Sequence, residues 1–223
     1  MLKPHHRSST FSVAIAILAL VAGVAGAIHA GRLEAAETRA ADVVSDADWL
    51  SGLNGKHRQL FDAPVTNNGI PLVHLLNYYD TYNKAFGVKD QDINGVLTFY
   101  GFTTFHGLTD EMWARYDLGE FLGEKDAAGQ PYTANPWRTA PVILGSTLPQ
   151  ASIEAQQKRG ATFIICNNAL GILANMVAQK RGLDGQTVYA DMKSNILPGV
   201  TLVPAMVIAI GQAQEAGLTY HRQ

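Results

Sequence analysis

The sequence contains a single cysteine, Cys166, among 223 residues. An internal disulfide needs two cysteines, so the fold has to be held together by its core. Charged residues make up only 16% of the chain and the formal net charge is −2. This composition argues against nucleic acid as the main partner, because phosphate binding needs a concentrated basic surface.

The sequence also lacks the short motifs that hold nucleotides and metals. No glycine-rich phosphate-binding loop follows any expected strand. There is no His-Glu-x-x-His pattern and no pair of histidines at metal-ligand spacing. We therefore expect neither a bound cofactor nor a metal site.

The N-terminus has the composition of a targeting segment. Lys3 and Arg7 precede an apolar stretch, 11–20, and small residues follow as far as Ala30. This order predicts a secretory signal peptide over residues 1–30, so the mature protein is expected to be periplasmic or secreted, without a membrane span. An uncleaved membrane anchor is the alternative, since residues 11–28 barely reach a spanning length.

Beyond a tether at 31–47, residues 48–223 are expected to form a single α/β domain. Apolar runs and helical patterns alternate along it, which predicts a three-layer Rossmann-like fold with a mostly parallel sheet. The expected strands are 57–62, 95–100, 162–166, 200–203 and 218–220. The expected helices are 70–86, 110–116, 151–159, 169–179, 187–195 and 205–216, the last of them opened by Pro204.

Two connecting segments stand out in this pattern. Residues 101–107 are expected to be a loop after the strand 95–100. Residues 120–149 form an irregular insert, and so long an irregular stretch in a compact domain is usually functional or mobile. Within it, Trp137 and Arg138 either close over a ligand or lie where a packed tryptophan anchors the insert.

Polar side chains follow three of the expected strands. Thr103, Thr104 and His106 follow the first, Cys166, Asn167 and Asn168 end the second, and Pro204 follows the third. In open parallel sheets, ligands bind beyond the carboxyl ends of the strands, so these groups are expected to converge. We interpret Cys166 as a nucleophile, His106 as its base or proton shuttle, and the other five residues as ligand-binding.

Each of these residues also has a structural interpretation. A free cysteine at the end of an apolar strand is often simply buried. Asn167 or Asn168 suits the N-cap of the following helix, a role that does not exclude lining a site. A histidine in a loop is commonly only a solvated polar residue.

Three segments of the C-terminal third, 160–170, 196–205 and 212–220, resemble the DsrE/DsrF-like family, which includes the YchN-like proteins. They contain a Cys-Asn-Asn-Ala-Leu segment, a Pro-Gly-Val strand that leads into Val-Pro, and a helix that ends near Ala-Gly-Leu-Thr-Tyr. The resemblance implies a Rossmann-like three-layer fold, assembly into homo-oligomers and a role in sulfur trafficking. It also implies that Cys166 carries a persulfide.

Two hypotheses follow from the sequence. In the first, the exported protein carries sulfane sulfur on Cys166, and its partners are small sulfur species or a sulfur-donor or sulfur-acceptor protein. In the second, it is a non-catalytic binding or assembly module in which the cysteine is structural.

Overall fold

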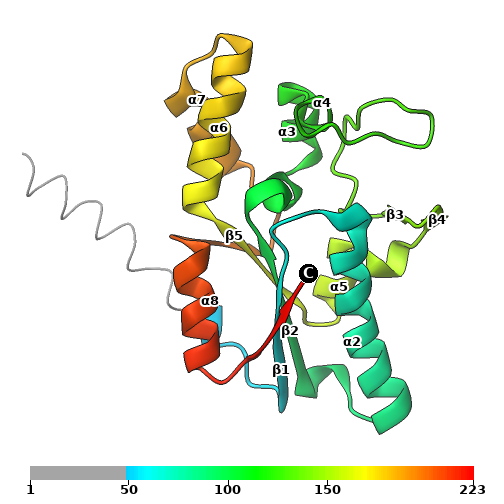
Figure 1. The fold of residues 1–223 in the computed structure, drawn as a ribbon. Helices are drawn as coiled ribbons and strands as arrows, with labels where there is room; N and C mark the ends of the chain where they lie inside the picture. Colours follow the sequence, from blue (N-terminus) through cyan, green and yellow to red (C-terminus); the bar gives the residue numbers. More distant parts are fainter. Residues whose placement is uncertain (1–48) are drawn as a thin grey trace, which may run out of the picture. The chain divides into compact units, whose positions relative to one another are not determined.

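A five-stranded parallel sheet forms the centre of the computed structural model, which describes residues 49–223 (Figure 1). The strand order is β6-β5-β2-β1-β7, and every neighbouring pair is parallel. The strands are β1 (His57–Asp62), β2 (Ile93–Phe99), β5 (Thr162–Cys166), β6 (Val200–Val203) and β7 (Thr219–Arg222). The predicted signal peptide and tether lie outside the described residues.

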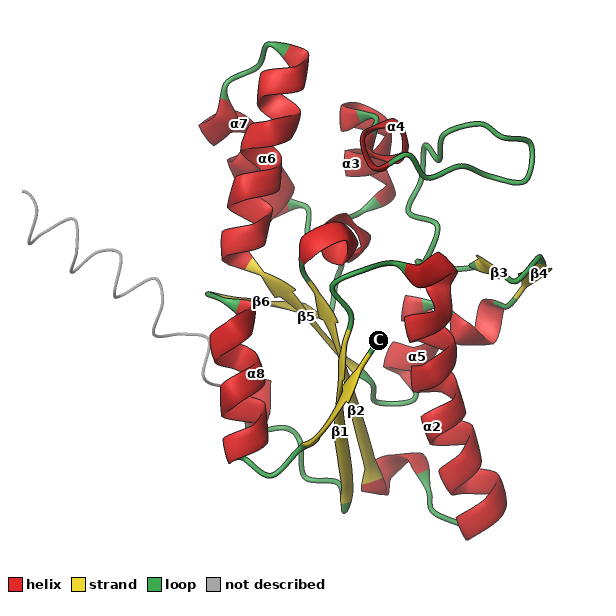
Figure 2. Ribbon diagram, viewed as in Figure 1, coloured by secondary structure: helices red, strands yellow, loops and turns green. Residues whose placement is uncertain are grey.

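Helices cover both faces of this sheet. In Figure 2, α2 and α5 lie on one side and α8 on the other, while α6 and α7 pack together beyond the carboxyl end of β5. The helices are α2 (Ile70–Phe86), α3 (Asp110–Tyr116), α4 (Leu118–Leu122), α5 (Ile153–Lys158), α6 (Asn167–Arg181), α7 (Gly185–Ser194) and α8 (Met206–Glu215). The predicted three-layer α/β fold is confirmed.

The two faces of the sheet bury two separate hydrophobic cores. Successive side chains of a strand point to opposite faces, and β5 shows the consequence clearly. Phe163 and Ile165 join a large core with residues of α2, α3 and α6, whereas Ile164 and Cys166 join a smaller core with residues of α8. The chain thus places the cysteine on the α8 side of the sheet.

Residues 101–107 form a 3₁₀ helix, η4 (Gly101–Gly107), and not the expected loop. The hydroxyl of Thr103 accepts a hydrogen bond from the Tyr100 N–H (3.1 Å) and donates one to the Ala63 carbonyl (2.6 Å). Such side-chain bonds to nearby backbone compete with other local conformations and stabilise a short helical turn. The other short 3₁₀ helices are η2 (Asn67–Gly69), η3 (Asp90–Asp92) and η5 (Pro149–Ala151).

Pro204 does not open the last helix, which corrects a second expectation. Helix α8 begins at Met206 and its N-cap is Ala205, so Pro204 lies in the turn between β6 and α8. The Pro204 carbonyl accepts the Asn168 N–H at 3.2 Å. The carbonyl of Pro204 therefore links the turn after β6 to the start of α6 by a hydrogen bond.

The insert 120–149 is ordered by buried polar and aromatic groups. It includes a two-residue antiparallel pair, β3 (Val142–Ile143) and β4 (Ser146–Thr147). The Asn135 amide donates to the carbonyls of His106 (2.7 Å) and Leu108 (2.8 Å), and its oxygen accepts the Trp137 N–H (3.0 Å). Trp137 itself is only 4% exposed, so the interpretation of this tryptophan as an anchor is confirmed.

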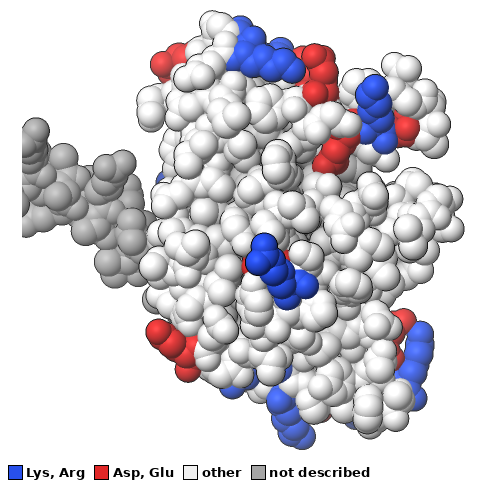
Figure 3. Space-filling view, viewed as in Figure 1, with Lys and Arg blue, Asp and Glu red and all other residues white. Residues whose placement is uncertain are grey.

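Two further features of residues 49–223 are the charge on their surface and the length of their helices. The face shown in Figure 3 is mostly uncharged, with small groups of charged side chains of both signs scattered over it. Among residues 49–223, no helix combines the length and the apolar character needed to cross a membrane.

Candidate functional site

Cys166 ends β5 and is also the N-cap of α6. Its Sγ accepts the N–H of Ala169, the third residue of that helix, at 3.4 Å. The backbone at Cys166 is extended, with φ −79° and ψ 117°, as is typical of a capping residue. The first turn of α6 therefore directs an unpaired N–H at the sulfur.

A second helix contributes another donor to the same sulfur atom. The N–H of Met206, the first residue of α8, lies 3.3 Å from Cys166 Sγ. The register of the sheet explains this contact between Met206 and the sulfur. Cys166 pairs with Val203 of β6, and the chain continues from there through Pro204 directly into α8. Two helix N-termini thus converge on one sulfur, and both their N–H groups and their dipoles stabilise negative charge there.

The sulfur is nearly enclosed. Cys166 is 5% exposed and packs in the α8-side core, which also holds Val203 and Met206. The residue therefore combines features of both sequence-based interpretations, since two backbone N–H groups contact its sulfur and its low exposure suits a structural role.

The two asparagines after Cys166 have different partners. The side-chain oxygen of Asn167 accepts the Tyr189 hydroxyl of α7 at 2.6 Å. Asn168 has an exposed side chain, and its backbone N–H donates a hydrogen bond to the Pro204 carbonyl. Neither asparagine caps α6, because Cys166 occupies the N-cap position, so the capping role expected for one of them was wrong.

His106 lies in a different environment from the cysteine. It is fully buried, contrary to the solvated position that is common for loop histidines. Its ring centroid lies 4.1 Å from that of Trp137 and 5.2 Å from that of Trp113, two residues of the α2-side core. Its Nε2 atom is 3.2 Å from Glu124 Oε2. The contacts described for His106 therefore do not include the pairing with Cys166 that the sequence suggested.

Thr103 and Thr104 are also buried and use their hydroxyls locally. Thr103 binds Ala63 and Tyr100 as described above, and Thr104 Oγ1 donates to the Gly101 carbonyl at 2.9 Å. These bonds stabilise η4 and its junction with β1. The expected convergence is thus limited, within the described contacts, to Cys166, the start of α6 and the turn at Pro204.

A buried carboxylate at the same end of the sheet was not anticipated from the sequence. Asp62 ends β1, is 4% exposed, and accepts the Tyr220 hydroxyl through Oδ2. Its Oδ1 has no hydrogen-bond partner. Burial, followed by the Asp62 carboxylate, raises the pKa of the Tyr100 hydroxyl, because both disfavour the phenolate. Only the position of Asp62 at a strand end could have signalled this cluster.

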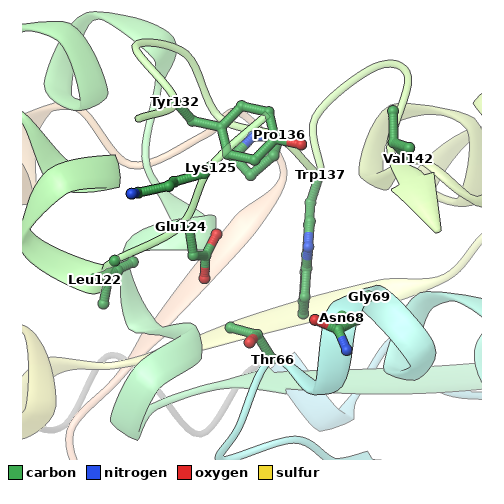
Figure 4. A pocket seen from close by; sticks show the side chains of 11 residues that line it. Thr66, Asn68, Gly69, Leu122, Glu124, Lys125, Tyr132, Pro136, Trp137 and Val142 are labelled. Atoms are coloured by element: carbon green, nitrogen blue, oxygen red, sulfur yellow. The ribbon is translucent and has the colours of Figure 1, made fainter. Parts of the chain in front are cut away.

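The insert and the start of α2 line a cavity of about 360 Å³ that opens to solvent. Glu124, Tyr132 and Trp137 contribute to its wall from the insert, and Thr66 and Gly69 contribute from the segment that leads into α2 (Figure 4). The sequence indicated that the insert was unusual but did not single out Glu124. Among residues 49–223, no group of three or more His, Cys, Asp or Glu side chains is arranged to hold a metal ion.

Comparison with known proteins adds no assignment to this geometry. No protein-family model, no curated protein and no solved structure matches the chain. The resemblance of the three C-terminal segments to the DsrE/DsrF-like family therefore stays a prediction from their motifs.

Proposed function

We propose that this protein carries sulfane sulfur on Cys166. The observation that supports the proposal is the pair of backbone N–H groups, from Ala169 and Met206, that both point at Cys166 Sγ. A thiolate is the nucleophilic form of cysteine, and donors from two helix N-termini favour that form. The same donors can also stabilise the negative charge of a persulfide.

The chemistry requires two successive exchanges of an S–S bond. With thiosulfate as donor, the Cys166 thiolate attacks the outer sulfur, a new S–S bond forms to Cys166, and the S–S bond of thiosulfate breaks to release sulfite with the electron pair. The product is a cysteine persulfide with a terminal anionic sulfur. An acceptor thiolate then attacks that terminal sulfur and leaves the Cys166 thiolate, so no external oxidant or reductant is consumed.

The proposal extends to the setting of this chemistry. The predicted signal peptide favours an exported protein, and the family resemblance favours a homo-oligomer that exchanges sulfur with a small sulfur species or a partner protein. Because Cys166 is only 5% exposed, sulfur transfer requires a donor or acceptor that contacts the carboxyl end of β5 directly.

Intact-mass spectrometry after treatment with thiosulfate or polysulfide tests the proposal. We expect the native protein to gain the mass of one or more sulfur atoms, and dithiothreitol to remove it. Cys166→Ser is the matched variant, because its hydroxyl can still accept the two N–H groups. A wild-type protein that gains no sulfur, or a Cys166→Ser variant that gains the same mass, would falsify the proposal.

A binding or assembly module with a structural cysteine is the second candidate, and the burial of Cys166 supports it. The two candidates differ in the rate at which iodoacetamide alkylates the native protein at neutral pH. A carrier is expected to react in the folded state. A structural cysteine is expected to react only at the rate of unfolding, so that stabilising the fold slows the reaction.

A further inference from the structure

We propose that the cavity between the insert and the start of α2 is a second site, which binds a small organic cation through the Glu124 carboxylate. The site is separate from Cys166, which does not line this cavity, and it does not depend on sulfur transfer. Its volume of about 360 Å³ lies within the range of ligand-binding pockets.

Glu124 supplies the negative charge. Its side chain is 20% exposed, and its described side-chain partner is the fully buried His106, whose Nε2 is 3.2 Å from Oε2. His106 Nδ1 has no hydrogen-bond partner. The ring can donate from Nε2 to Glu124 Oε2, and Oε1 of the carboxylate has no described hydrogen bond of its own. No lysine or arginine of the described residues forms an ion pair with Glu124, so this carboxylate at the cavity wall is available to pair with a cationic ligand.

Buried aromatic contacts fix the position of this carboxylate. The ring of His106 is held between Trp113 and Trp137, and Asn135 binds both the His106 carbonyl and the Trp137 N–H. His106 is therefore a positioning residue, because it orients Glu124 without lining the cavity itself. A carboxylate that is held in place loses less conformational entropy when it binds a ligand.

Aromatic side chains form the rest of the recognition surface. Figure 4 shows the Trp137 indole across the cavity from Glu124, with Tyr132 above them. Aromatic faces attract cations, and they also cover the methylene or methyl groups that surround an ammonium charge. After burial itself, the nearby carboxylates Asp126 and Glu124 raise the pKa of the Tyr132 hydroxyl, consistent with a negative potential in this region.

Lys125 is the one cationic residue in the wall, and its direction is compatible with the proposal. In Figure 4 its ammonium group extends away from Trp137. No described ion pair ties Lys125 to a carboxylate. The lysine is therefore able to stay in solvent when a ligand cation occupies the space between Glu124 and Trp137.

The test is calorimetric titration of the full chain with n-butylammonium and with tetramethylammonium. Butan-1-ol serves as the neutral counterpart of butylammonium and butyrate as the anionic one. We expect saturable binding of at least one cation, and no comparable binding of the alcohol or the carboxylate. Loss of a charge-assisted contact predicts that Glu124→Gln weakens this binding by about tenfold or more.

Three variants make the test specific. Glu120→Gln is the matched control, because Glu120 lies in the same region but pairs with Lys180 and does not line the cavity. It should leave the affinity unchanged, as should Cys166→Ser. Lys125→Gln, at an exposed position, should leave cation binding unchanged or tighten it.

Several results would overturn the proposal. These are the absence of saturable binding by either cation, equal binding by butan-1-ol, unaltered affinity in a folded Glu124→Gln variant, or loss of cation binding in Lys125→Gln. Far-ultraviolet circular dichroism of each variant establishes that it is folded.

Discussion

The sulfur of Cys166 accepts the N–H of Met206 at 3.3 Å, although 40 residues separate the two in sequence. With the bond from Ala169, this contact joins the first turns of α6 and α8 at one atom. A single side chain therefore satisfies donors from two helices that would otherwise lack partners. The arrangement has consequences for stability as well as for reactivity.

Cys166→Ala is expected to destabilise the protein by about 1–3 kcal/mol, because it removes an N-cap and leaves the buried Met206 N–H without a partner. Cys166→Ser should lose less, since its oxygen still accepts hydrogen bonds. Urea unfolding followed by circular dichroism measures both free energies. Equal stability of the alanine variant and the wild type would show that the sulfur contacts contribute nothing to folding.

Asn135→Ala is expected to lower the free energy of unfolding by at least about 2 kcal/mol. The change removes three hydrogen bonds to the backbone of His106, Leu108 and Trp137, and Asn135 is only 6% exposed. Asn77→Ala, at an exposed position on α2, is the control and should change stability by no more than about 0.5 kcal/mol. Similar effects of the two changes in urea unfolding would contradict the structural role of Asn135.

Gly95→Ala tests the close approach of α2 to β2. A Cβ atom at Gly95 would clash with Leu75 Cδ1 and lie 3.0 Å from Tyr79 Cε2, both within the larger core. We expect destabilisation by about 1–3 kcal/mol from overpacking. At Gly211, in α8, a Cβ would meet nothing within 4 Å, so Gly211→Ala should stabilise the helix by about 0.5–1 kcal/mol. The midpoints of thermal unfolding should move in opposite directions, and a downward shift in both would reject this expectation.

Arg159 should make stability depend on pH in the acid range. Its guanidinium binds both oxygens of Asp90 and also Asp80, and its hydrogen bond is the main cause that lowers the pKa of Asp90 below its ordinary value of 3.8. A carboxylate with a lowered folded-state pKa stabilises the fold above its unfolded-state pKa, and this contribution is lost as the pH falls through the lowered value. We expect Arg159→Gln to be less stable than the wild type at pH 7.

The difference between Arg159→Gln and the wild type should shrink as the pH falls below about 3.8, and it should be smallest below the lowered pKa, where Asp90 is protonated in both folded proteins. Lys158→Gln, at the neighbouring exposed position, should show no such convergence. The measurement is a series of urea unfolding curves from pH 7 downward. A stability difference that is constant over this range would argue against the ion pair as its source.

Local sequence patterns predicted much of the fold. The bounds of β1, α2 and α3 agree with the expected ranges to the residue, because strand alternation, helical periodicity and the Gly87 C-cap are all encoded within a few positions. The position of Cys166 between a strand and a helix was predicted for the same reason.

The side-chain partners within the site were much less predictable. The pattern that placed His106 after a strand could not show that its ring is buried between Trp113 and Trp137. Asn167 and Asn168 are good N-cap residues by type, yet the cap is Cys166, because α6 begins at Asn167, two residues before the expected start at 169. Pro204 likewise fits a helix start by type but lies in the preceding turn.

The alternation of strands and helices, and the position of one thiol at the carboxyl edge of the sheet, depend on short-range periodicity and end signals and are therefore readable from the sequence. Which groups meet at each site depends instead on how the elements pack together. The Met206 N–H reaches the Cys166 sulfur across 40 residues, and Glu124 binds His106 across 18. Only the packing of the chain brings such distant donors and acceptors within hydrogen-bonding distance, and it placed the cysteine in the smaller core and the histidine against tryptophans of the larger one.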